Sequence, residues 1–391
     1  MLLKKQKTVI HYAKHNFLIQ GVLMILPDFI DAPPVVYAVG KEYQIFVQVK
    51  HECLMWVKVG SEEYYDDSNG ILRSASMTHK MVVPMEELDQ AKKYTICYRI
   101  IGERLPYFSK TGPVEELTFE FRPVPADGEN LRMYMISDTH NRVNAPVEAG
   151  KFFGDKLDLL ILNGDIPDHS GDIQNFNAIY QIAGQITKGE KPAIFSRGNH
   201  DTRGFYAERF ADFTPTDRGV SYYTVRMGDL WCLILDTAED KPDDHPEYGN
   251  TVCCHSFRMD QLRFLKKVIA NADKEYNAPG VTKRMIISHT PFTYIIHPPF
   301  DIEQPLYKEW ISLIGEHIKP DFYLCGHLHA CKVIRPGDPD DHYGQSCPTV
   351  VGALPYRDDW DKFDACAIEY GDEITVKFTD QDKNVLQTHI L

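Results

Sequence analysis

The stretch LRMYMISDTH, residues 131–140, joins an apolar run to a polar tetrapeptide that includes Asp138 and His140. The run at 131–136 is short and mostly apolar, which is typical of a buried β-strand. A strand that stops abruptly at a carboxylate and an imidazole places two potential metal ligands at its carboxyl end. The same arrangement recurs along the second half of the chain, so this stretch indicates how that half is built.

Four further apolar runs end in the same way: LDLLIL (157–162) before NGDIPD, PAIFS (192–196) before RGNHD, RMIIS (284–288) before His289, and DFYLC (321–325) before GHLH. Each motif alone is equally well explained by a turn or a core histidine. Turns and core histidines do not explain why the motifs recur at the ends of successive strands. In an open α/β sheet, polar groups at the carboxyl ends of the strands converge on one crevice. We therefore expect one site formed by Asp138, His140, Asp165, Asn199, His289, His327 and His329.

The chemistry of these seven side chains indicates metal binding. They are carboxylate, imidazole and amide groups without a thiolate, a set that suits divalent first-row metals better than a structural zinc knot. Seven ligands exceed what one small ion usually takes. A bridging carboxylate would let them hold two ions about 3.5–4 Å apart, the spacing used for phosphoryl displacement. The sequence predicts two divalent ions drawn from Mn, Fe or Zn.

In this order, DxH, GDxxD, GNHD, a separated His and GHxH resemble the signature of the calcineurin-like metallophosphoesterase superfamily over residues 131–330. The resemblance implies a four-layer αββα sandwich. It also implies hydrolysis of phosphate mono- or diesters by in-line attack of a metal-bridging hydroxide. By this resemblance Asp165 bridges the two ions. The remaining ligands divide into two sets: Asp138, His140 and His329 for one ion, and Asn199, His289 and His327 for the other.

The resemblance also assigns roles to residues that do not bind metal. His200 would protonate the leaving oxygen or stabilise the developing charge, with Asp201 orienting it. The chain is similar to purple acid phosphatases in carrying a β-rich region before the motifs. Those enzymes have a Tyr ligand to ferric iron where this chain has Asp168, so an obligate ferric site does not carry over. Asp168 either supports the metal ligands or caps a turn.

Several basic residues lie near the motifs. Arg197 precedes the GNH run and resembles the RGNH form of Ser/Thr protein phosphatases, in which the Arg binds phosphate through its planar fork. A salt bridge at the pocket edge is the alternative interpretation. Arg142, Arg203 and His169 lie in loops that can reach a substrate, although a solvated loop position is the simpler expectation for each.

The first 125 residues differ from the rest of the chain. They contain the short β-rich runs VVYAV, EYQIFVQVK, CLMWVKVG, KMVVPM, YTICYRII and ELTFEFRPV, which predict an all-β sandwich of immunoglobulin or fibronectin-III type. The polar stretch at 123–130 then separates this domain, 1–125, from a catalytic α/β domain, 126–391. Within the second domain, apolar periodicity predicts a helix at 257–272, and the alternation after 363 predicts a closing pair of strands.

Composition bounds the partners and the compartment. The formal charge of -14 disfavours nucleic acid, and no segment approaches the length of a membrane span. The nine cysteines, including Cys253, Cys254, Cys325 and Cys331, indicate reduced thiols and a cytoplasmic location rather than disulfides or zinc. The start MLLKKQK with the apolar stretch at 17–26 imitates a signal peptide, but interrupting His and Lys residues favour a first β-strand.

The leading function is therefore a phosphoesterase acting on a small-molecule or peptide phosphate ester. A non-catalytic scaffold is the second interpretation, because retromer's scaffold subunit uses this fold for protein contacts. Such scaffolds tend to lose motif residues that are present here. A nuclease is the third, and the acidic charge disfavours it. Substrate identity would reside in loops such as 237–252 and 294–307, and neither these loops nor the motifs predict an oligomeric state.

Overall fold

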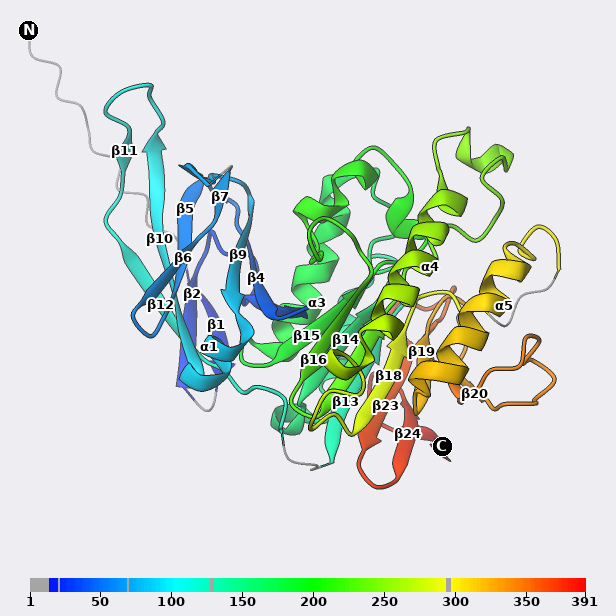
Figure 1. The fold of residues 1–391 in the computed structure, drawn as a ribbon. Coiled ribbons are helices and arrows are strands. Elements are labelled where there is room, and N and C mark those ends of the chain that lie inside the picture. The colour runs from blue at the N-terminus through cyan, green and yellow to red at the C-terminus, as the bar shows by residue number, and fades with distance from the viewer. Residues whose placement is uncertain (1–13, 20–21, 69, 127–129, 293–296) are drawn as a thin grey trace, which may run out of the picture.

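The computed structural model describes residues 14–19, 22–68, 70–126, 130–292 and 297–391. The signal-peptide-like start at 1–13 lies outside the described residues, as do 127–129 of the linker and 294–296 of one predicted specificity loop. Two large sheets pack face to face, and helices cover the outer side of each (Figure 1). The expected αββα order of layers is confirmed.

The first sheet carries three of the five motifs. Alternate residues of its strand at 131–136 face opposite sides: Met133 and Met135 lie in the core between the sheets. Tyr134 and Ile136 pack in a second core with the outer helices. The motif-bearing half of the chain supplies three parallel strands, three antiparallel strands and two covering helices, namely β13 (Leu131–Ile136), β14 (Leu159–Asn163), β15 (Pro192–Ser196), β23 (Phe363–Tyr370), β24 (Ile374–Thr379), β25 (Val385–Ile390), α2 (Asn144–Gly150) and α3 (Asn177–Thr187). The expected closing pair of strands is thus a set of three.

The second sheet carries the other two motifs. Its strands and covering helices are β16 (Tyr223–Met227), β17 (Leu230–Ile234), β18 (Lys283–Ile287), β19 (Phe322–Cys325), β20 (Lys332–Ile334), β21 (Thr349–Val351), α4 (Cys254–Ala270) and α5 (Gln304–Leu313). The helix predicted at 257–272 is α4, which buries Leu262, Leu265 and Val268 against this sheet. The apolar spacing therefore identified the correct helix face.

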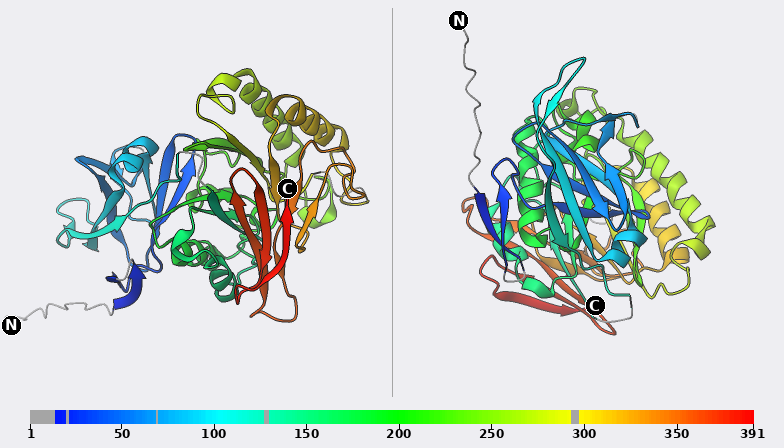
Figure 2. Two further views of the ribbon diagram at one scale, coloured as in Figure 1. Left: turned by 90° about the horizontal axis from the view of Figure 1, so that it is seen from below. Right: turned by 90° about the vertical axis from the view of Figure 1, so that its left-hand side faces the viewer.

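The N-terminal region is a two-layered β-sandwich, as expected (Figure 2). One layer consists of β5 (Cys53–Val59), β6 (Glu62–Tyr65), β10 (Lys93–Glu103), β11 (Lys110–Thr111) and β12 (Glu115–Glu120). The other consists of β3 (Val35–Val39), β4 (Glu42–Gln48) and β9 (Thr78–Pro84). Smaller elements complete the chain: β1 (Lys14–Ile19), β2 (Val22–Pro27), β7 (Asp67–Ser68), β8 (Leu72–Arg73), α1 (Met85–Ala91) and β22 (Leu354–Pro355).

One layer of this sandwich is the end of the first catalytic sheet. β15 pairs in parallel with β3, with Ala193 opposite Tyr37. A second link is made by Tyr94, whose hydroxyl donates to the carbonyl of Gly189 over 2.8 Å. The first sheet therefore runs across the predicted boundary at residue 125, and a single core contains apolar residues from both segments.

The composition led us to expect reduced cysteines and no membrane span. All nine cysteines are free. Within the described ranges, no helix has both the length and the apolar character needed to cross a lipid bilayer.

The shared sheet predicts that the two segments unfold together. Ile45 in β4 is fully buried in the core that also contains Met133 and Ile234. We expect Ile45→Ala to lower the free energy of unfolding by about 2–5 kcal/mol because it leaves a cavity. In calorimetry a single endotherm should move to lower temperature. Val82→Ala, at an exposed position of β9, is the control and should leave the transition in place. Two endotherms of which only one shifts would contradict this prediction.

Candidate metal centre

The seven predicted residues meet where the two sheets face each other. They follow the carboxyl ends of β13, β14 and β15 in the first sheet and of β18 and β19 in the second. Parallel strands end at the same edge of a sheet, so five loops distant in sequence converge. The crevice thus lies between two sheet edges rather than within one open sheet.

The backbone of these loops is strained at the residues that carry the site. Five of the seven have a positive φ between 44° and 67°, which non-glycine residues rarely adopt: Asp138, His140, Asp165, His327 and His329. Each such conformation costs on the order of 1–3 kcal/mol and persists only where surrounding contacts hold it. Here the backbone N–H of Asp138 donates to the carbonyl of Gly164, and that of His140 to the carbonyl of Asp165. The strain turns the side chains into the crevice.

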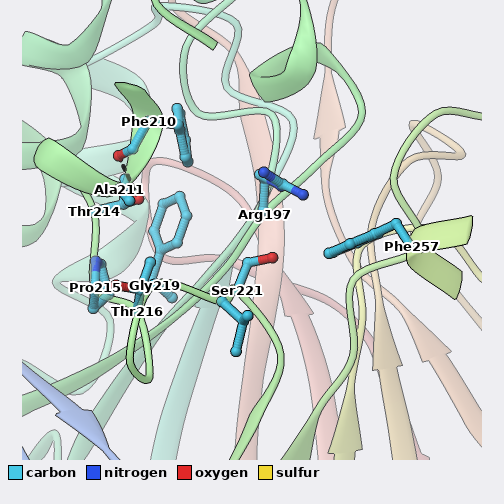
Figure 3. A pocket seen from close by; sticks show the side chains of 11 residues that line it. Arg197, Phe210, Ala211, Thr214, Pro215, Thr216, Gly219, Ser221 and Phe257 are labelled. Atoms are coloured by element: carbon cyan, nitrogen blue, oxygen red, sulfur yellow. Dashed lines mark hydrogen bonds between the residues drawn. The ribbon is translucent and has the colours of Figure 1, made fainter. Parts of the chain in front are cut away.

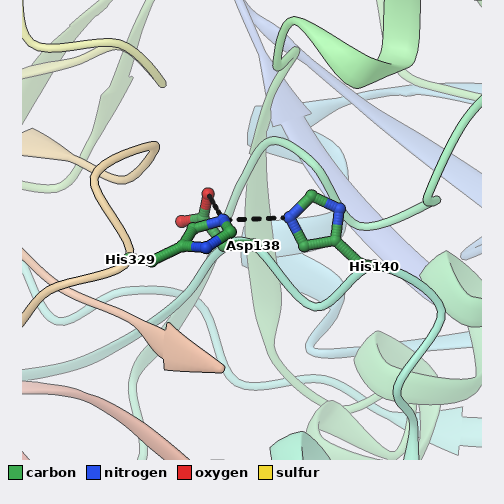
Figure 4. A group of neighbouring side chains, drawn as sticks. All are labelled: Asp138, His140 and His329. Atoms are coloured by element: carbon green, nitrogen blue, oxygen red, sulfur yellow. Dashed lines mark hydrogen bonds and ion pairs between the residues drawn. The ribbon is translucent and has the colours of Figure 1, made fainter. Parts of the chain in front are cut away.

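One group of ligand atoms belongs to Asp138, His140 and His329, which lie within 4.8 Å of one another (Figure 4). The Nε2 atoms of His140 and His329 are 3.1 Å apart, and His329 Nε2 is 3.5 Å from Asp138 Oδ1. Two nitrogens that each lie about 2.0–2.1 Å from one ion are separated by roughly 3.0–3.4 Å. The group therefore has the spacing that a single divalent ion requires.

A second group contains Asp165, His289 and His327. His289 Nδ1 is held 2.7 Å from the carbonyl of Asn163, which turns Nε2 towards the crevice. This Nε2 atom is fully buried without a hydrogen bond, 3.1 Å from Asp165 Oδ2 and 3.7 Å from Asp138 Oδ1. Asn199 Oδ1 joins the group at 3.0 Å from His327 Nδ1.

The electrostatics of the centre fit cations. Asp138 and Asp165 are almost completely buried, and burial alone would lower the pKa of the neighbouring His289. The two carboxylates outweigh burial and raise that pKa to about 10. Burial, together with the positive charge of His289, lowers the pKa of His327 to about 4. Two buried carboxylates surrounded by imidazoles, one with an orphaned nitrogen, form a donor set that suits divalent metal ions.

The comparisons with known proteins agree with this geometry. The family described as calcineurin-like phosphoesterase matches residues 131–331, just over half of the chain. The chain belongs to the calcineurin-like phosphoesterases. The match covers all five motifs and ends just after GHLH.

Solved structures show how far the fold extends. A purple acid phosphatase from yellow lupin (Lupinus luteus) seeds has a TM-score of 0.60 at 14% identity, covering 94% of this chain and 77% of the lupin chain. The structure of PhoD has a TM-score of 0.55 at 10% identity, covering 92% and 88%. At these identities the likeness concerns the fold, and it includes the N-terminal β-rich region. No curated protein sequence matches the chain.

In this calcineurin-like phosphoesterase, His200 borders the centre but is held differently from the expectation. Its Nδ1 lies 2.7 Å from the carbonyl of Asp168, and no hydrogen bond in the described chain joins the ring to Asp201. Instead Asp201 Oδ2 accepts hydrogen bonds from the backbone N–H groups of Gly198 and Asp165. Asp201 therefore holds the motif loops together, because its buried carboxylate satisfies their backbone donors.

Asp168, in the position of the ferric-iron Tyr, contacts two site histidines. Besides accepting from His200, it places Oδ1 3.4 Å from His140 Nδ1. His140 Nδ1 makes no hydrogen bond, so the carboxylate lies behind the ring at ion-pair distance, while Nε2 on the other side of the ring faces His329. The geometry favours the supporting role over the turn cap. The three residues His140, Asp168 and His200 also have ligand atoms within 4.8 Å of one another.

Arg197 does not line this crevice, in contrast to its proposed phosphate-binding role. Its Nε lies 2.6 Å from the fully buried Asp236 Oδ2, and its guanidinium lies 5.2 Å from the Phe257 ring centroid. It borders a separate cavity of about 90 Å³ with Ser221 and Thr216 (Figure 3). The salt-bridge alternative is the one observed, because the nearest carboxylate draws the side chain away from the metal centre.

Other basic residues occupy the position expected for Arg197. Arg203 lines the crevice, with Nη1 3.3 Å from His200 Nε2, and is paired with the buried carboxylate of Glu239. Arg142 is almost buried at an adjoining groove. Both were expected to be solvated, and both are part of the site wall. Arg357 was missed altogether because it lies outside every motif. No cysteine joins a potential metal group within the described residues, and Cys254 and Cys325 are buried.

The motif glycines allow the loops to approach the ligands. A Cβ atom at Gly326 would meet Ser137 Oγ, and it would lie 2.6 Å from Asp138 Oδ2. We expect Gly326→Ala to lower the free energy of unfolding by about 1–3 kcal/mol, because the crowded carboxylate must move. Denaturant titration measures this change. Gly112→Ala is the control, since a Cβ there meets nothing closer than 3.7 Å. Equal stability of both variants would show that the loops yield freely.

Proposed function

We propose that this protein is a phosphoesterase that depends on two divalent metal ions and hydrolyses phosphate mono- or diesters. The observation that carries the proposal is the pair of ligand groups in one crevice, each built from one buried carboxylate and two imidazoles. When bound, two such ions lower the pKa of a water towards about 7 and offset the negative charge of phosphate oxygens. Mn, Fe and Zn are the candidate ions.

The residues of the centre form two sets of ligands, one for each ion. Asp138, His140 and His329 would hold one ion, and His289, His327 and Asn199 the other. Asp165 is the candidate bridge. Its Oδ1 accepts a hydrogen bond from the backbone N–H of His200 over 2.9 Å, while Oδ2 lies 3.1 Å from His289 Nε2. Both oxygens are thereby fixed in direction, which supports a bridging geometry.

His200 is the candidate proton donor to the leaving oxygen. Its contact with the Asp168 carbonyl assigns the N–H to Nδ1 and leaves Nε2 facing the crevice. Arg203 Nη1 borders the same space at 3.3 Å from Nε2. In this geometry the guanidinium, which can only donate, gives its hydrogen to Nε2. A protonated His200 would instead donate from Nε2 to an alkoxide there, and Arg203 would offset the charge of the phosphate.

The space above the centre suits a small substrate. Two adjoining cavities of about 320 and 450 Å³ open over it, a size typical of small-molecule sites. A small-molecule or peptide phosphate ester is the proposed partner, and a cytoplasmic location remains our expectation from the free cysteines. The second interpretation, a scaffold, is tested by the same experiments.

Metal removal and restoration test the ion requirement. We expect chelation to abolish hydrolysis of phosphate esters, and supply of Mn, Zn or Fe to restore it with two ions per chain by elemental analysis. Asp165→Asn should lose most of the bound metal because the bridge loses its charge. Asp155→Asn, at an exposed carboxylate far from the centre, should bind metal as the wild type does. A well-folded protein without metal or hydrolysis would instead support the scaffold.

The role of His200 predicts a dependence on the leaving group. We expect His200→Ala to slow hydrolysis of an alkyl phosphate by about 10²–10⁴-fold, because the alkoxide needs a proton. The loss should be much smaller for 4-nitrophenyl phosphate, whose leaving group departs without one. Steady-state kinetics on both substrates measure the two ratios. His317→Ala, at an exposed histidine, is the control. An equal loss on both substrates would remove the proton-donor role.

A further inference from the structure

A groove leads from the metal centre to a loop that no motif includes. The cavity of about 320 Å³ covers Asp165, Asn199 and His327, where the phosphate would lie. The cavity of about 450 Å³ continues beyond His140 towards Pro355 and Trp360. The two cavities share three lining residues, His200, His329 and Arg357.

The position of His200 indicates which cavity holds the phosphate and which holds the leaving group. A group that protonates the leaving oxygen must lie between the phosphate and the leaving group. His200 lines both cavities. Of the predicted metal ligands, Asp165, Asn199 and His327 line only the smaller cavity, His329 lines both, and His140 lines the inner end of the larger one. The larger cavity is therefore the space for the leaving group.

Trp360 is the large apolar side chain of that space. It stands in the loop between β22 and β23 and is 58% exposed, although burial of an indole is strongly favourable. The loop is fixed rather than loose, because Arg142 Nη2 donates to the carbonyl of Tyr356 over 3.0 Å and its guanidinium lies 4.5 Å from the Trp360 ring centroid. Tyr356 is itself fastened by its hydroxyl, which donates to Asp364 Oδ2 over 2.9 Å. A held, exposed indole beside a catalytic centre is a surface for stacking.

Arg357 is the unpaired cation of the same loop. It is exposed and makes no hydrogen bond or ion pair with any described residue, in a chain whose formal charge is -14. By contrast Arg203 and Lys241, which line the smaller cavity, each pair with a carboxylate. A guanidinium without an internal partner, at the junction of the two cavities, is available to bind phosphate oxygens.

We propose that Arg357 and Trp360 form a substrate rim that selects phosphate esters whose leaving group carries a planar aromatic ring. Arg357 binds the phosphoryl oxygens, and Trp360 stacks on the ring through the part of the indole that Arg142 leaves uncovered. Arg142 is a positioning residue that holds the rim. This inference rests on the proposed phosphoesterase function and adds the class of its substrates.

The test compares an aryl with an alkyl ester in each variant. With 2-naphthyl phosphate and butyl phosphate, the intrinsic difference between the leaving groups cancels when the kcat/KM ratio of a variant is divided by that of the wild type. Trp360→Ala should lower the aryl-to-alkyl ratio by about 5- to 100-fold, because the naphthyl ring loses a stacking surface that a butyl chain does not use as a ring does. Trp360→Phe should restore most of the ratio. Arg357→Ala should lower kcat/KM for both esters equally, by about 10- to 100-fold.

Two variants control for surface changes. Phe108→Ala removes an aromatic side chain that is 93% exposed on the hairpin between β10 and β11, and Arg218→Ala removes an exposed cation. Neither should alter the ratio. Metal content and the melting temperature, measured for every variant, should match the wild type and exclude a folding effect.

A binding measurement separates this proposal from the proposed function. Calorimetry with the metal-loaded protein compares 2-naphthylmethylphosphonate with butylphosphonate, neither of which is hydrolysed. If the wild type is inert towards esters yet binds the aryl phosphonate more tightly in a Trp360-dependent manner, the rim stands and the phosphoesterase function falls. If the wild type is active and Trp360→Ala lowers kcat/KM equally for both esters, or for neither of them, the rim is overturned and the function stands.

Discussion

Two buried carboxylates, Asp138 and Asp165, set the constraint on which the rest of the site depends. Neither can stay ionised away from water without positive charge beside it. His289 lies between them and supplies one charge through its raised pKa, at the expense of its own role as a ligand. Divalent ions would supply the charge more fully and release the proton from His289. The same surroundings that would be unfavourable in a simple core are therefore suited to a metal centre.

This constraint explains the backbone as well as the side chains. Ligands must point into one small volume from both sheets, and left-handed conformations at five of them provide the necessary directions. Such strain is tolerated because the strands behind it are firmly packed: the five strands that carry the motifs, β13, β14, β15, β18 and β19, are buried on two faces. The N-terminal sandwich contributes to this rigidity, since its β3–β4–β9 layer continues the sheet that carries the first three motifs.

The sequence was most informative where the signal is local. Apolar runs located most strands, such as β3, β5 and β13, and the motifs predicted seven side chains that the fold brings together in one crevice. It was less informative where a partner is distant in the chain. Arg197 pairs with Asp236, 39 positions away, and β3 pairs with β15 across the predicted boundary. No local pattern specifies either contact. For the same reason His200 was given Asp201 as its partner, whereas the fold supplies the Asp168 carbonyl.

Arg357 and Trp360 show why specificity is harder to predict than chemistry. The metal centre requires particular side chains at fixed strand ends, so its residues leave a pattern in the sequence. A rim requires only that some loop reach the groove. This loop does so because Arg142, two residues after the DxH motif, holds it in place. Arg142 is thus the physical link between the two parts. A loop fastened to the DxH segment can change its exposed residues without disturbing the ligands, which lets one centre serve different leaving groups.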